Sequence, residues 1–319
     1  MDPAGGTVAL GAFDELLAKK LVLVTGKGGI GKSLMAASLA QKAASEGQNV
    51  CMVESSAQDQ LAPLFGYPPV GHKLSLLRPN ISVINLNPQD NFRDFVVLHL
   101  GFARLFEKVF TKPIVRSFIQ MLPGIAELTL LGRLYHLCEE KKDFDLVVLD
   151  GFASGHFLSL LKTPDAVMNS GMVGPVIEET RKVREFIFDG SKVATMLVTT
   201  PEELVISEAL DFSQRLFNEV PSSVSHIAVN RCLSVKQQIL PSEEEAEEEG
   251  IGFALGYLRR RILSERKNLQ NLRDGLSKIY TQSQELAPRL SLLPDRGAID
   301  EPLPPGFAKH WFAEAQELT

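Results

Sequence analysis

A cluster of glycine, lysine and serine residues near the start of the chain has the spacing of a phosphate-binding loop. It reads Gly26-Lys27-Gly28-Gly29-Ile30-Gly31-Lys32-Ser33 and matches the pattern G-x-x-x-x-G-K-S. Glycines let the backbone curl so that successive N–H groups point inward at phosphate oxygens. We expect Lys32 to reach the terminal phosphates and the Ser33 hydroxyl to hold Mg²⁺. The pattern therefore predicts nucleotide binding at this loop.

The segments on either side of the loop are those that a P-loop requires. The apolar run Leu21–Thr25 reads as a buried strand, and a helix-forming segment from Leu34 to Ala44 follows the loop. A helix that begins near Lys32 would add the positive end of its dipole to the phosphate site. We expect the nucleotide to contact the whole loop, namely Gly26, Lys27, Gly28, Gly29, Ile30, Gly31, Lys32, Ser33 and Leu34.

Short apolar runs alternate with helical patterns along the chain, which is typical of βαβ units and a mainly parallel sheet. These runs lack polar alternation, as expected for strands covered by helices on both faces. The sequence predicts an α/β fold, a doubly wound P-loop NTPase sheet, in one domain over residues 1–319. The expected strands are Leu21–Thr25, Val50–Val53, Ile81–Leu86, Leu146–Leu149, Val193–Thr199 and His226–Asn230, with a further candidate at Leu290–Leu293.

Residues 90–140 depart from this alternation, because they hold many spaced apolar residues and no strand pattern. We interpret them as a helical insertion between two strands. Its apolar side chains either pack on the sheet and on one another, or form a partly exposed surface for a client or partner protein.

The C-terminal third contains three recognisable segments. The acidic run Glu243–Glu249 is expected to form an exposed loop or a frayed helix end, because its like charges repel one another. A long amphipathic helix is predicted over Gly252–Tyr280. A proline-rich tail and a short last helix, ending the chain, are expected after it.

Composition narrows the class of protein. The net charge of −6 argues against a nucleic-acid surface, which normally carries a basic stripe. The cysteines Cys51, Cys138 and Cys232 are far apart and form no C-x-x-C pair, so we expect neither structural zinc nor a disulfide framework. The first twenty residues lack a signal-peptide pattern, and no apolar run approaches the ~18 residues that span a bilayer. We expect a cytoplasmic protein.

The position of Lys27, directly after the first glycine, makes this loop resemble the deviant P-loop of the MinD/ParA/ArsA class of ATPases. Members of that class form dimers with nucleotide sandwiched between the protomers. The resemblance implies that Lys27 reaches across the dimer to the partner's phosphates. A second cation there would offset charge that develops on the γ-phosphoryl oxygens and the leaving group.

Further stretches resemble the ArsA type within that class. The segment from Leu146 to Leu158 is similar to its switch II, which implies that Asp150 holds a Mg²⁺-bound water, although a strand-end aspartate could also simply cap the next turn. Leu197–Glu203 and Val229–Arg231 resemble the LVTLPEE and VNR stretches, and by this resemblance Asn230 recognises adenine. Its amide could satisfy a donor and an acceptor on the base.

Two weaker matches complete the resemblance. Pro123–Leu128 is similar to the PGIDE segment of the family's insertion, and Leu292-Leu293-Pro294 lies where the family places a loop over the base, so Pro294 is expected near the nucleotide. The chain thus resembles the ArsA / guided-entry ATPases, which pump arsenite with a membrane partner or escort tail-anchored membrane proteins. This implies ATP or ADP with Mg²⁺, a homodimer or a heterodimer with a paralogue, and a protein client or membrane-associated partner.

The chain departs from the family at switch I, which usually reads DPAHS. Here Glu54 stands near the position of the family's water-orienting aspartate, and Asp59 lies five residues further on. Either carboxylate could orient the attacking water, so we expect weak hydrolysis, with Glu54→Gln reducing turnover more than Asp59→Asn. We assign catalytic roles to Lys27, Lys32, Asp150 and Glu54.

Two other readings remain open at this stage. The altered switch I also fits a nucleotide-gated scaffold that pairs with a catalytic paralogue. A small-molecule kinase or amide-forming ligase of the same P-loop class is a further alternative, although the apolar insertion speaks against a polar substrate pocket. The cysteine cluster that would hold arsenite is absent from the sequence, so we do not expect an arsenite-pump subunit.

Overall fold

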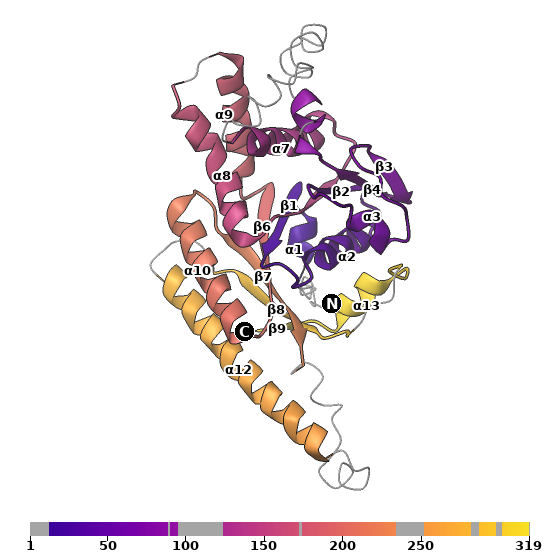
Figure 1. Cartoon of the computed structure of the whole chain (residues 1–319), viewed down its shortest axis with the longest axis vertical. Coiled ribbons are helices and arrows are strands. Elements are labelled where there is room, and N and C mark those ends of the chain that lie inside the picture. The colour runs from indigo at the N-terminus through magenta and orange to yellow at the C-terminus, as the bar shows by residue number, and fades with distance from the viewer. Residues whose placement is uncertain are drawn as a thin grey trace, which may run out of the picture.

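The computed structural model describes residues 13–88, 90–94, 124–171, 174–233, 252–281, 287–297 and 302–318 (Figure 1). Within these ranges the chain forms one nine-stranded sheet with the order β3-β4-β2-β5-β1-β6-β7-β8-β9. The strands are β1 (Leu21–Gly26), β2 (Val50–Glu54), β3 (Ser75–Arg78), β4 (Ile81–Asn85), β5 (Leu146–Asp150), β6 (Val193–Thr199), β7 (Val224–Cys232), β8 (Arg289–Pro294) and β9 (Gln316–Glu317).

The pairing confirms the expected mainly parallel, doubly wound α/β fold. All pairs from β4 across to β8 are parallel, and only the edge strands β3 and β9 run antiparallel to their neighbours. Strand β1 lies inside the sheet, between β5 and β6, so its carboxyl end is flanked by two other carboxyl ends. Ligands of such sheets bind outside these ends.

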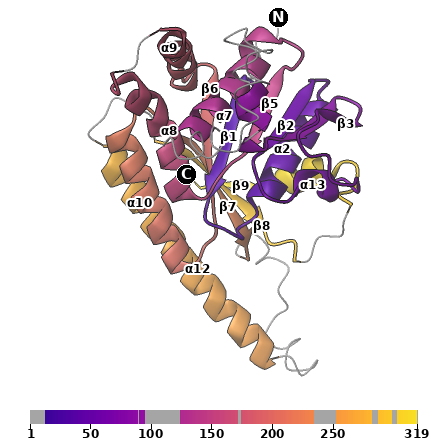
Figure 2. The same ribbon diagram turned by 45° about the horizontal axis from the view of Figure 1, so that its top comes forward.

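Helices cover both faces of the sheet. They are α1 (Asp14–Leu17), α2 (Lys32–Ser45), α3 (Leu61–Leu64), α7 (Ile125–Tyr135), the π-helical segment η1 (His136–Glu140), α8 (Ser154–Met168), α9 (Pro175–Ile187), α10 (Glu203–Glu219), α12 (Gly252–Tyr280) and α13 (Phe307–Ala313). In Figures 1 and 2 the helices α10 and α12 lie side by side, and one end of α12 extends beyond the other described elements.

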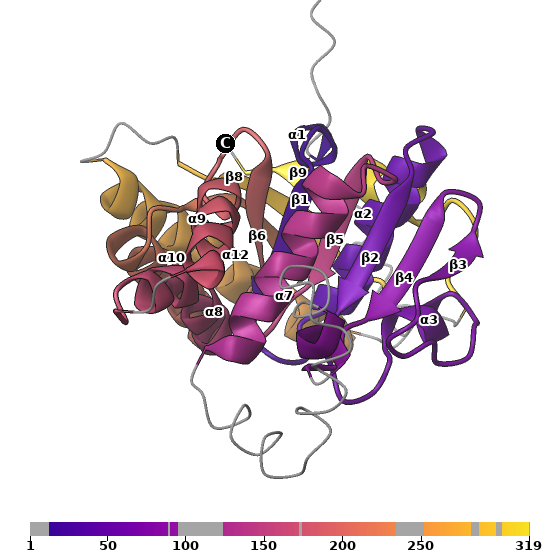
Figure 3. The ribbon, with the colours of Figure 1, turned by 90° about the horizontal axis from the view of Figure 1, so that it is seen from above.

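Two hydrophobic cores form because successive residues of β1 point to opposite faces. Leu21 and Leu23 join one core with residues of α7, α8, α10 and α12, whereas Val22 and Val24 join the other with α2 and α13. Figure 3 shows α7 and α8 on one side of the strands and α2 on the other. Since both faces of β1 are buried, its first four residues are all apolar, as expected for a strand covered by helices on both faces.

The element boundaries confirm most of the expected strands and the long helix. The helix predicted over Gly252–Tyr280 is α12, with those bounds, and the candidate strand near Leu290 is β8. Strands β3 and β9 were not predicted. The expectation that a short helix ends the chain was wrong, because α13 is followed by β9, which pairs with β8 through Ser291 and Leu292. Two residues of edge strand carry no periodic pattern that a sequence could reveal.

Parts of the expected helical insertion can be located. Residues 90–94 and 125–140 are helical and lie in the sequence between β4 and β5. Most of the apolar residues that suggested the insertion lie in 95–123, outside the described residues, as does the acidic run Glu243–Glu249. The choice between a client surface and a plain core therefore stays a prediction.

The three cysteines are all described, and each is buried with a free thiol. Burial raises the pKa of Cys51 to about 12 and also raises the pKa values of Cys138 and Cys232. None of the helices in the described ranges is both long enough and apolar enough to cross a bilayer.

Candidate nucleotide-binding site

The loop between β1 and α2 has the backbone geometry of a phosphate cradle. Gly26 has φ +142° and Gly31 has φ +98°, values that L side chains rarely adopt. A Cβ at Gly26 would lie 2.2 Å from the Val198 carbonyl oxygen of β6, and one at Gly31 would lie 2.5 Å from the Asn230 amide nitrogen. Glycine is therefore required at both positions for steric as well as conformational reasons.

Lys32 lies at the start of α2 and folds back over the loop. Its Nζ donates a hydrogen bond of 2.9 Å to the carbonyl oxygen of Lys27, so the side chain spans the loop from one end to the other. Burial lowers the pKa of Lys32, and the charge of the Asp150 carboxylate works in the opposite direction. A phosphate entering the loop would supply this half-buried cation with a stronger acceptor than a neutral carbonyl.

Asp150 lies at the carboxyl end of β5, beside the P-loop strand. It pairs in register with Val24 of β1 on one side and with Glu54 of β2 on the other. Burial raises the pKa of Asp150, and the neighbouring Ser33 hydroxyl and Lys32 ammonium partly oppose that rise. Its Oδ1 atom is buried without a hydrogen-bond partner in the described part of the chain. A buried, unpartnered carboxylate oxygen calls for a ligand or a cation.

The residues around Asp150 fit a magnesium ion. Mg²⁺ prefers hard oxygen ligands and is usually held by one or two side chains together with substrate phosphates. The Ser33 hydroxyl, the Asp150 carboxylate and the phosphates of a nucleotide in the loop would provide such a set. Mg²⁺ bound there would neutralise charge on the phosphate oxygens. Among the described residues, no hydrogen bond shows Asp150 capping the turn that follows β5. This favours a role as a magnesium ligand over a role as a turn cap.

Glu54 is buried, with 1% of its surface exposed, and its carboxylate faces its own loop. It accepts hydrogen bonds from the backbone N–H groups of Gln60 at 2.9 Å and Leu61 at 3.4 Å, and from the Ser56 hydroxyl at 3.2 Å. Burial nevertheless raises the pKa of Glu54 to about 7, although the two backbone hydrogen bonds act to lower it. A carboxylate with a pKa near neutrality is suited to accept a proton from water.

Asp59 is engaged elsewhere. It accepts hydrogen bonds from the backbone N–H groups of Val70 at 2.5 Å and Gly71 at 2.9 Å, and from the Asn85 side chain at 2.8 Å. Burial raises the pKa of Asp59, but these hydrogen bonds outweigh it, so the net shift is downward. Of the two carboxylates that the sequence left open, Asp59 orders the loop, and Glu54 is the better candidate for the reaction.

Asn230 connects β7 to the P-loop. Its Nδ2 donates to the Ile30 carbonyl oxygen at 2.9 Å, and its Oδ1 accepts from the Arg231 backbone N–H at 2.8 Å. The amide is thus buried and already paired at both ends. The structure brings Asn230 to the P-loop and gives it a role that the sequence did not suggest, which is holding the loop in place. Recognition of adenine by this side chain remains a prediction.

Pro294 ends β8 and pairs in register with Cys232 of β7. Its carbonyl oxygen accepts a hydrogen bond of 3.3 Å from the indole N–H of Trp311. The residue therefore lies at the same edge of the sheet as Asn230, where a loop over the base would begin. Its contact with a nucleotide also remains a prediction.

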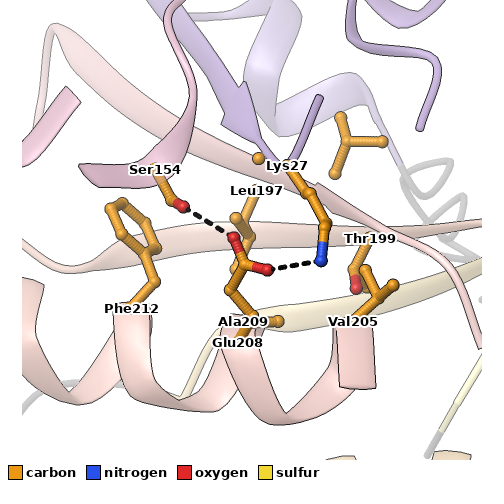
Figure 4. A pocket seen from close by; sticks show the side chains of 10 residues that line it. Lys27, Ser154, Leu197, Thr199, Val205, Glu208, Ala209 and Phe212 are labelled. Carbon is orange, nitrogen blue, oxygen red and sulfur yellow. Dashed lines mark hydrogen bonds and ion pairs between the residues drawn. The ribbon is translucent and has the colours of Figure 1, made fainter. Parts of the chain in front are cut away.

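Lys27 is paired within its own chain. Its Nζ lies 3.0 Å from Glu208 Oε2 of α10, and the other carboxylate oxygen of Glu208 accepts a hydrogen bond of 3.3 Å from the Ser154 hydroxyl (Figure 4). The side chains of Lys27 and Glu208 are 45% and 40% exposed. The sequence reasoning identified Lys27 but not Glu208, because one glutamate on an amphipathic helix carries no signal of its own.

Gln60 and Thr25 were likewise missed as parts of the site. The Gln60 amide oxygen accepts a hydrogen bond of 3.0 Å from the Ser33 hydroxyl, which links switch I to the P-loop. Thr25 Oγ1 donates to the Phe152 carbonyl oxygen at 2.9 Å, which links the P-loop strand to the loop after β5. Gln60 could have been suspected, since it lies in the Glu54–Gln60 stretch that aligns with switch I.

The cradle, the half-buried lysine and the carboxylate at the end of β5 define a P-loop nucleotide-binding protein. Residues 19–174, the part of the chain that holds the P-loop and Asp150, match the family model described as anion-transporting ATPase. The resemblance predicted from the motifs is therefore confirmed.

Curated relatives carry related names. The chain is 27% identical over 275 residues to ATPase BagA of Mycobacterium tuberculosis, an alignment that covers 80% of this chain and 78% of the relative. It is 26% identical over 294 residues to ATPase GET3B of Arabidopsis thaliana, with 72% and 69% covered. It is 22% identical over 255 residues to a putative arsenical pump-driving ATPase of Chlorobaculum tepidum, with 68% and 62% covered. Together with the site, these similarities support ATP binding within an ATPase family.

The raised pKa of Glu54 predicts a pH-dependent effect on stability. Because its pKa rises from the ordinary 4.5 to about 7 on folding, the folded protein binds a proton here more tightly than the unfolded chain. Burying the ionised Glu54 carboxylate therefore lowers the stability of the folded protein. This loss of stability is complete above pH 7, becomes smaller as the pH falls from 7 to 4.5, and is absent below pH 4.5. We expect Glu54→Gln to be more stable than wild type at pH 8 by about 1–3 kcal/mol, and equal to it near pH 4.

Urea denaturation of the nucleotide-free protein between pH 4 and pH 8 measures this difference. Asp59→Asn is the matched control, because the pKa of Asp59 is lowered on folding, so its stabilising contribution is fully present above its unfolded pKa. Its loss should destabilise the protein by a nearly constant amount across most of this range. Parallel stability curves for wild type and Glu54→Gln across this range would contradict the expected burial cost.

Proposed function

We propose that the chain is a Mg²⁺-dependent ATPase that hydrolyses ATP to ADP and phosphate as a dimer, and that its nucleotide state controls the binding of a protein client or a membrane-associated partner. The observation that carries this proposal is that Lys32 and Ser33 lie next to Asp150, which has one unpartnered oxygen among the described residues, at the carboxyl ends of β1 and β5. This is the place where a doubly wound sheet binds its ligand.

The residues divide the chemistry among them. The P-loop N–H groups and Lys32 would hold the β- and γ-phosphates, and Ser33 with Asp150 would hold Mg²⁺. Glu54, buried and with a pKa of about 7, would orient the attacking water and accept its proton. Lys27 would act in trans on the phosphates of a second copy or of a paralogue.

The hydrogen bonds of the loops support coupling to nucleotide state. Ser33 contacts Gln60 of switch I, and Thr25 contacts Phe152 of the loop after β5, so both loops are attached to residues of the P-loop region. If Ser33 bound the Mg²⁺ that accompanies a nucleotide, its hydrogen bond to Gln60 would be lost. Loops held by phosphate and metal contacts are the usual means by which hydrolysis moves attached helices. The client surface would then lie on the helices that follow these loops.

ATP turnover by purified protein, with Lys27→Ala assayed beside it, tests this proposal. We expect the specific activity of wild type to rise with protein concentration and to be lost on chelation of Mg²⁺. We expect Lys27→Ala to lose about 10²–10³-fold in turnover, the usual effect of removing one group that stabilises transition-state charge. Activity that is independent of protein concentration and unchanged in Lys27→Ala would contradict the dimeric mechanism.

One observation favours a second candidate, a nucleotide-gated scaffold that hydrolyses ATP very slowly or pairs with a catalytic paralogue. The Glu54 carboxylate is held by two backbone N–H groups and the Ser56 hydroxyl, so freeing it for water requires switch I to rearrange. ATP binding without turnover, in wild type and in Lys27→Ala alike, would support this candidate. Turnover that appears only on mixing with a paralogue would support it further.

A further inference from the structure

The ion pair between Lys27 and Glu208 places the lysine of the deviant P-loop in contact with its own chain. Lys27 Nζ lies 3.0 Å from Glu208 Oε2, and Ser154 donates to Glu208 Oε1 at 3.3 Å. Figure 4 shows the glutamate carboxylate between the lysine and the serine, at the edge of a small pocket. Each of the three side chains comes from a different element.

The sheet topology brings these three elements together. Strand β1, which leads into the P-loop, pairs with β5 on one side and β6 on the other. Helix α8 begins at Ser154, four residues after Asp150 of β5, and α10 begins at Glu203, shortly after β6. Glu208 therefore connects the P-loop to the start of α8, just after the loop that follows Asp150, the candidate magnesium ligand. A displacement of that loop would act on Glu208 through Ser154.

The carboxylate of Glu208 and a phosphate of another protomer would compete for the Lys27 ammonium. An ammonium on a flexible stem can exchange one acceptor for another without a change in the backbone. Both side chains are about two-fifths exposed. Ion pairs at such exposure shift an equilibrium by at most about fivefold, so a stronger anion can replace Glu208, although the pair can still favour one position of the lysine. The position of the lysine thus depends on which anion competes for it.

We propose that Glu208 is a positioning residue that holds Lys27 within the free protomer and releases it to the γ-phosphate of ATP bound in a second copy of the chain. Ser154 orients the glutamate and connects this exchange to the loop after β5. Glu208 therefore opposes dimer formation until nucleotide is bound. This inference rests on the in-trans role of Lys27 in the proposed function.

The variant Glu208→Gln tests the inference, because glutamine keeps the size of the side chain and an acceptor for Ser154 but removes the charge. An exposed ion pair is worth about 1.4- to fivefold in an equilibrium. A dimer uses two copies of Lys27, so we expect the dimer dissociation constant to fall by about two- to 25-fold. Sedimentation with a non-hydrolysable ATP analogue and Mg²⁺ measures this without requiring turnover.

Two further variants show whether the effect passes through Lys27. Asp211→Asn removes a negative charge from an exposed position of the same helix and should leave the dimer dissociation constant unchanged. The double variant Glu208→Gln/Lys27→Ala should behave as Lys27→Ala alone. If Glu208→Gln tightens the dimer equally in the Lys27→Ala background, the effect comes from the overall charge of the protomers and not from release of Lys27. That result would overturn the inference.

The outcomes separate this inference from the proposed function. If Lys27→Ala weakens the dimer while Glu208→Gln matches Asp211→Asn, the in-trans lysine stands and the role of Glu208 is overturned. If Lys27→Ala dimerises and turns over ATP like wild type, both fail. A tighter Glu208→Gln dimer that needs Lys27, with thermal unfolding unchanged, supports the inference.

Discussion

Replacing Lys32 by alanine is expected to lower ATP turnover by about 10²–10³-fold and to weaken nucleotide binding. Lys32 is half-buried at the start of α2, and its Nζ lies 2.9 Å from the Lys27 carbonyl oxygen, across the cradle that the glycines form. It is the cation best placed for charge that develops on the transferred phosphoryl group, and loss of one such group typically costs this much.

Turnover under saturating Mg-ATP, together with titration of a fluorescent ATP analogue, measures both effects. Lys182→Ala is a suitable control, because Lys182 is an exposed lysine on α9 that pairs with Glu179 and lies outside the site. Retained turnover in Lys32→Ala, with a normal thermal unfolding curve, would show that the cradle does not bind the reacting phosphates.

Replacing Asp150 by asparagine is expected to remove the Mg²⁺ dependence of ATP binding and to lower turnover by about 10²-fold or more. The carboxylate lies in register with Val24 and Glu54 at the carboxyl edge of the sheet, and its Oδ1 is buried without a partner among the residues described. An amide has the same size but lacks the charge that a hard cation requires.

The ATP affinity of wild type and Asp150→Asn, measured with Mg²⁺ and with a chelator, gives a readout that does not depend on catalysis. We expect added Mg²⁺ to strengthen binding to wild type and to leave the variant nearly unchanged. Asp143→Asn, which removes an exposed carboxylate paired with Lys141, should behave as wild type. An equal response to Mg²⁺ in both proteins would exclude Asp150 as a ligand.

The fold could be predicted from the sequence to a large extent, because long apolar runs and a 29-residue amphipathic helix leave few alternatives. The strand order and the two edge strands could not. Ser75–Arg78 and Gln316–Glu317 are short and partly exposed, so neither hydrophobic periodicity nor composition distinguishes them from loops. Their strand conformation depends on pairing with β4 and with β8, and these hydrogen bonds form only on folding.

The candidate site, like the fold, could be predicted from the sequence only in part. The sequence proposed the P-loop glycines, Lys32 and Ser33, because phosphate binding imposes a fixed local spacing on a contiguous segment. It proposed Asp150 through the resemblance to switch II. The sequence could not decide between Glu54 and Asp59. Three hydrogen bonds to Asp59 and the burial of Glu54 now distinguish them, and both arise from contacts with the segment around Val70 and with the sheet.

The sequence by itself determined that this protein has a P-loop between a buried strand and a helix, since those features require only neighbouring residues. Only the tertiary structure decided which groups meet that loop from elsewhere. Asn230, which fixes the loop, lies 200 residues from Ile30, and Glu208, which holds Lys27, belongs to a helix that follows a different strand. The physical reason is that hydrogen bonds and ion pairs depend on distances in space, which the packing of the whole sheet sets.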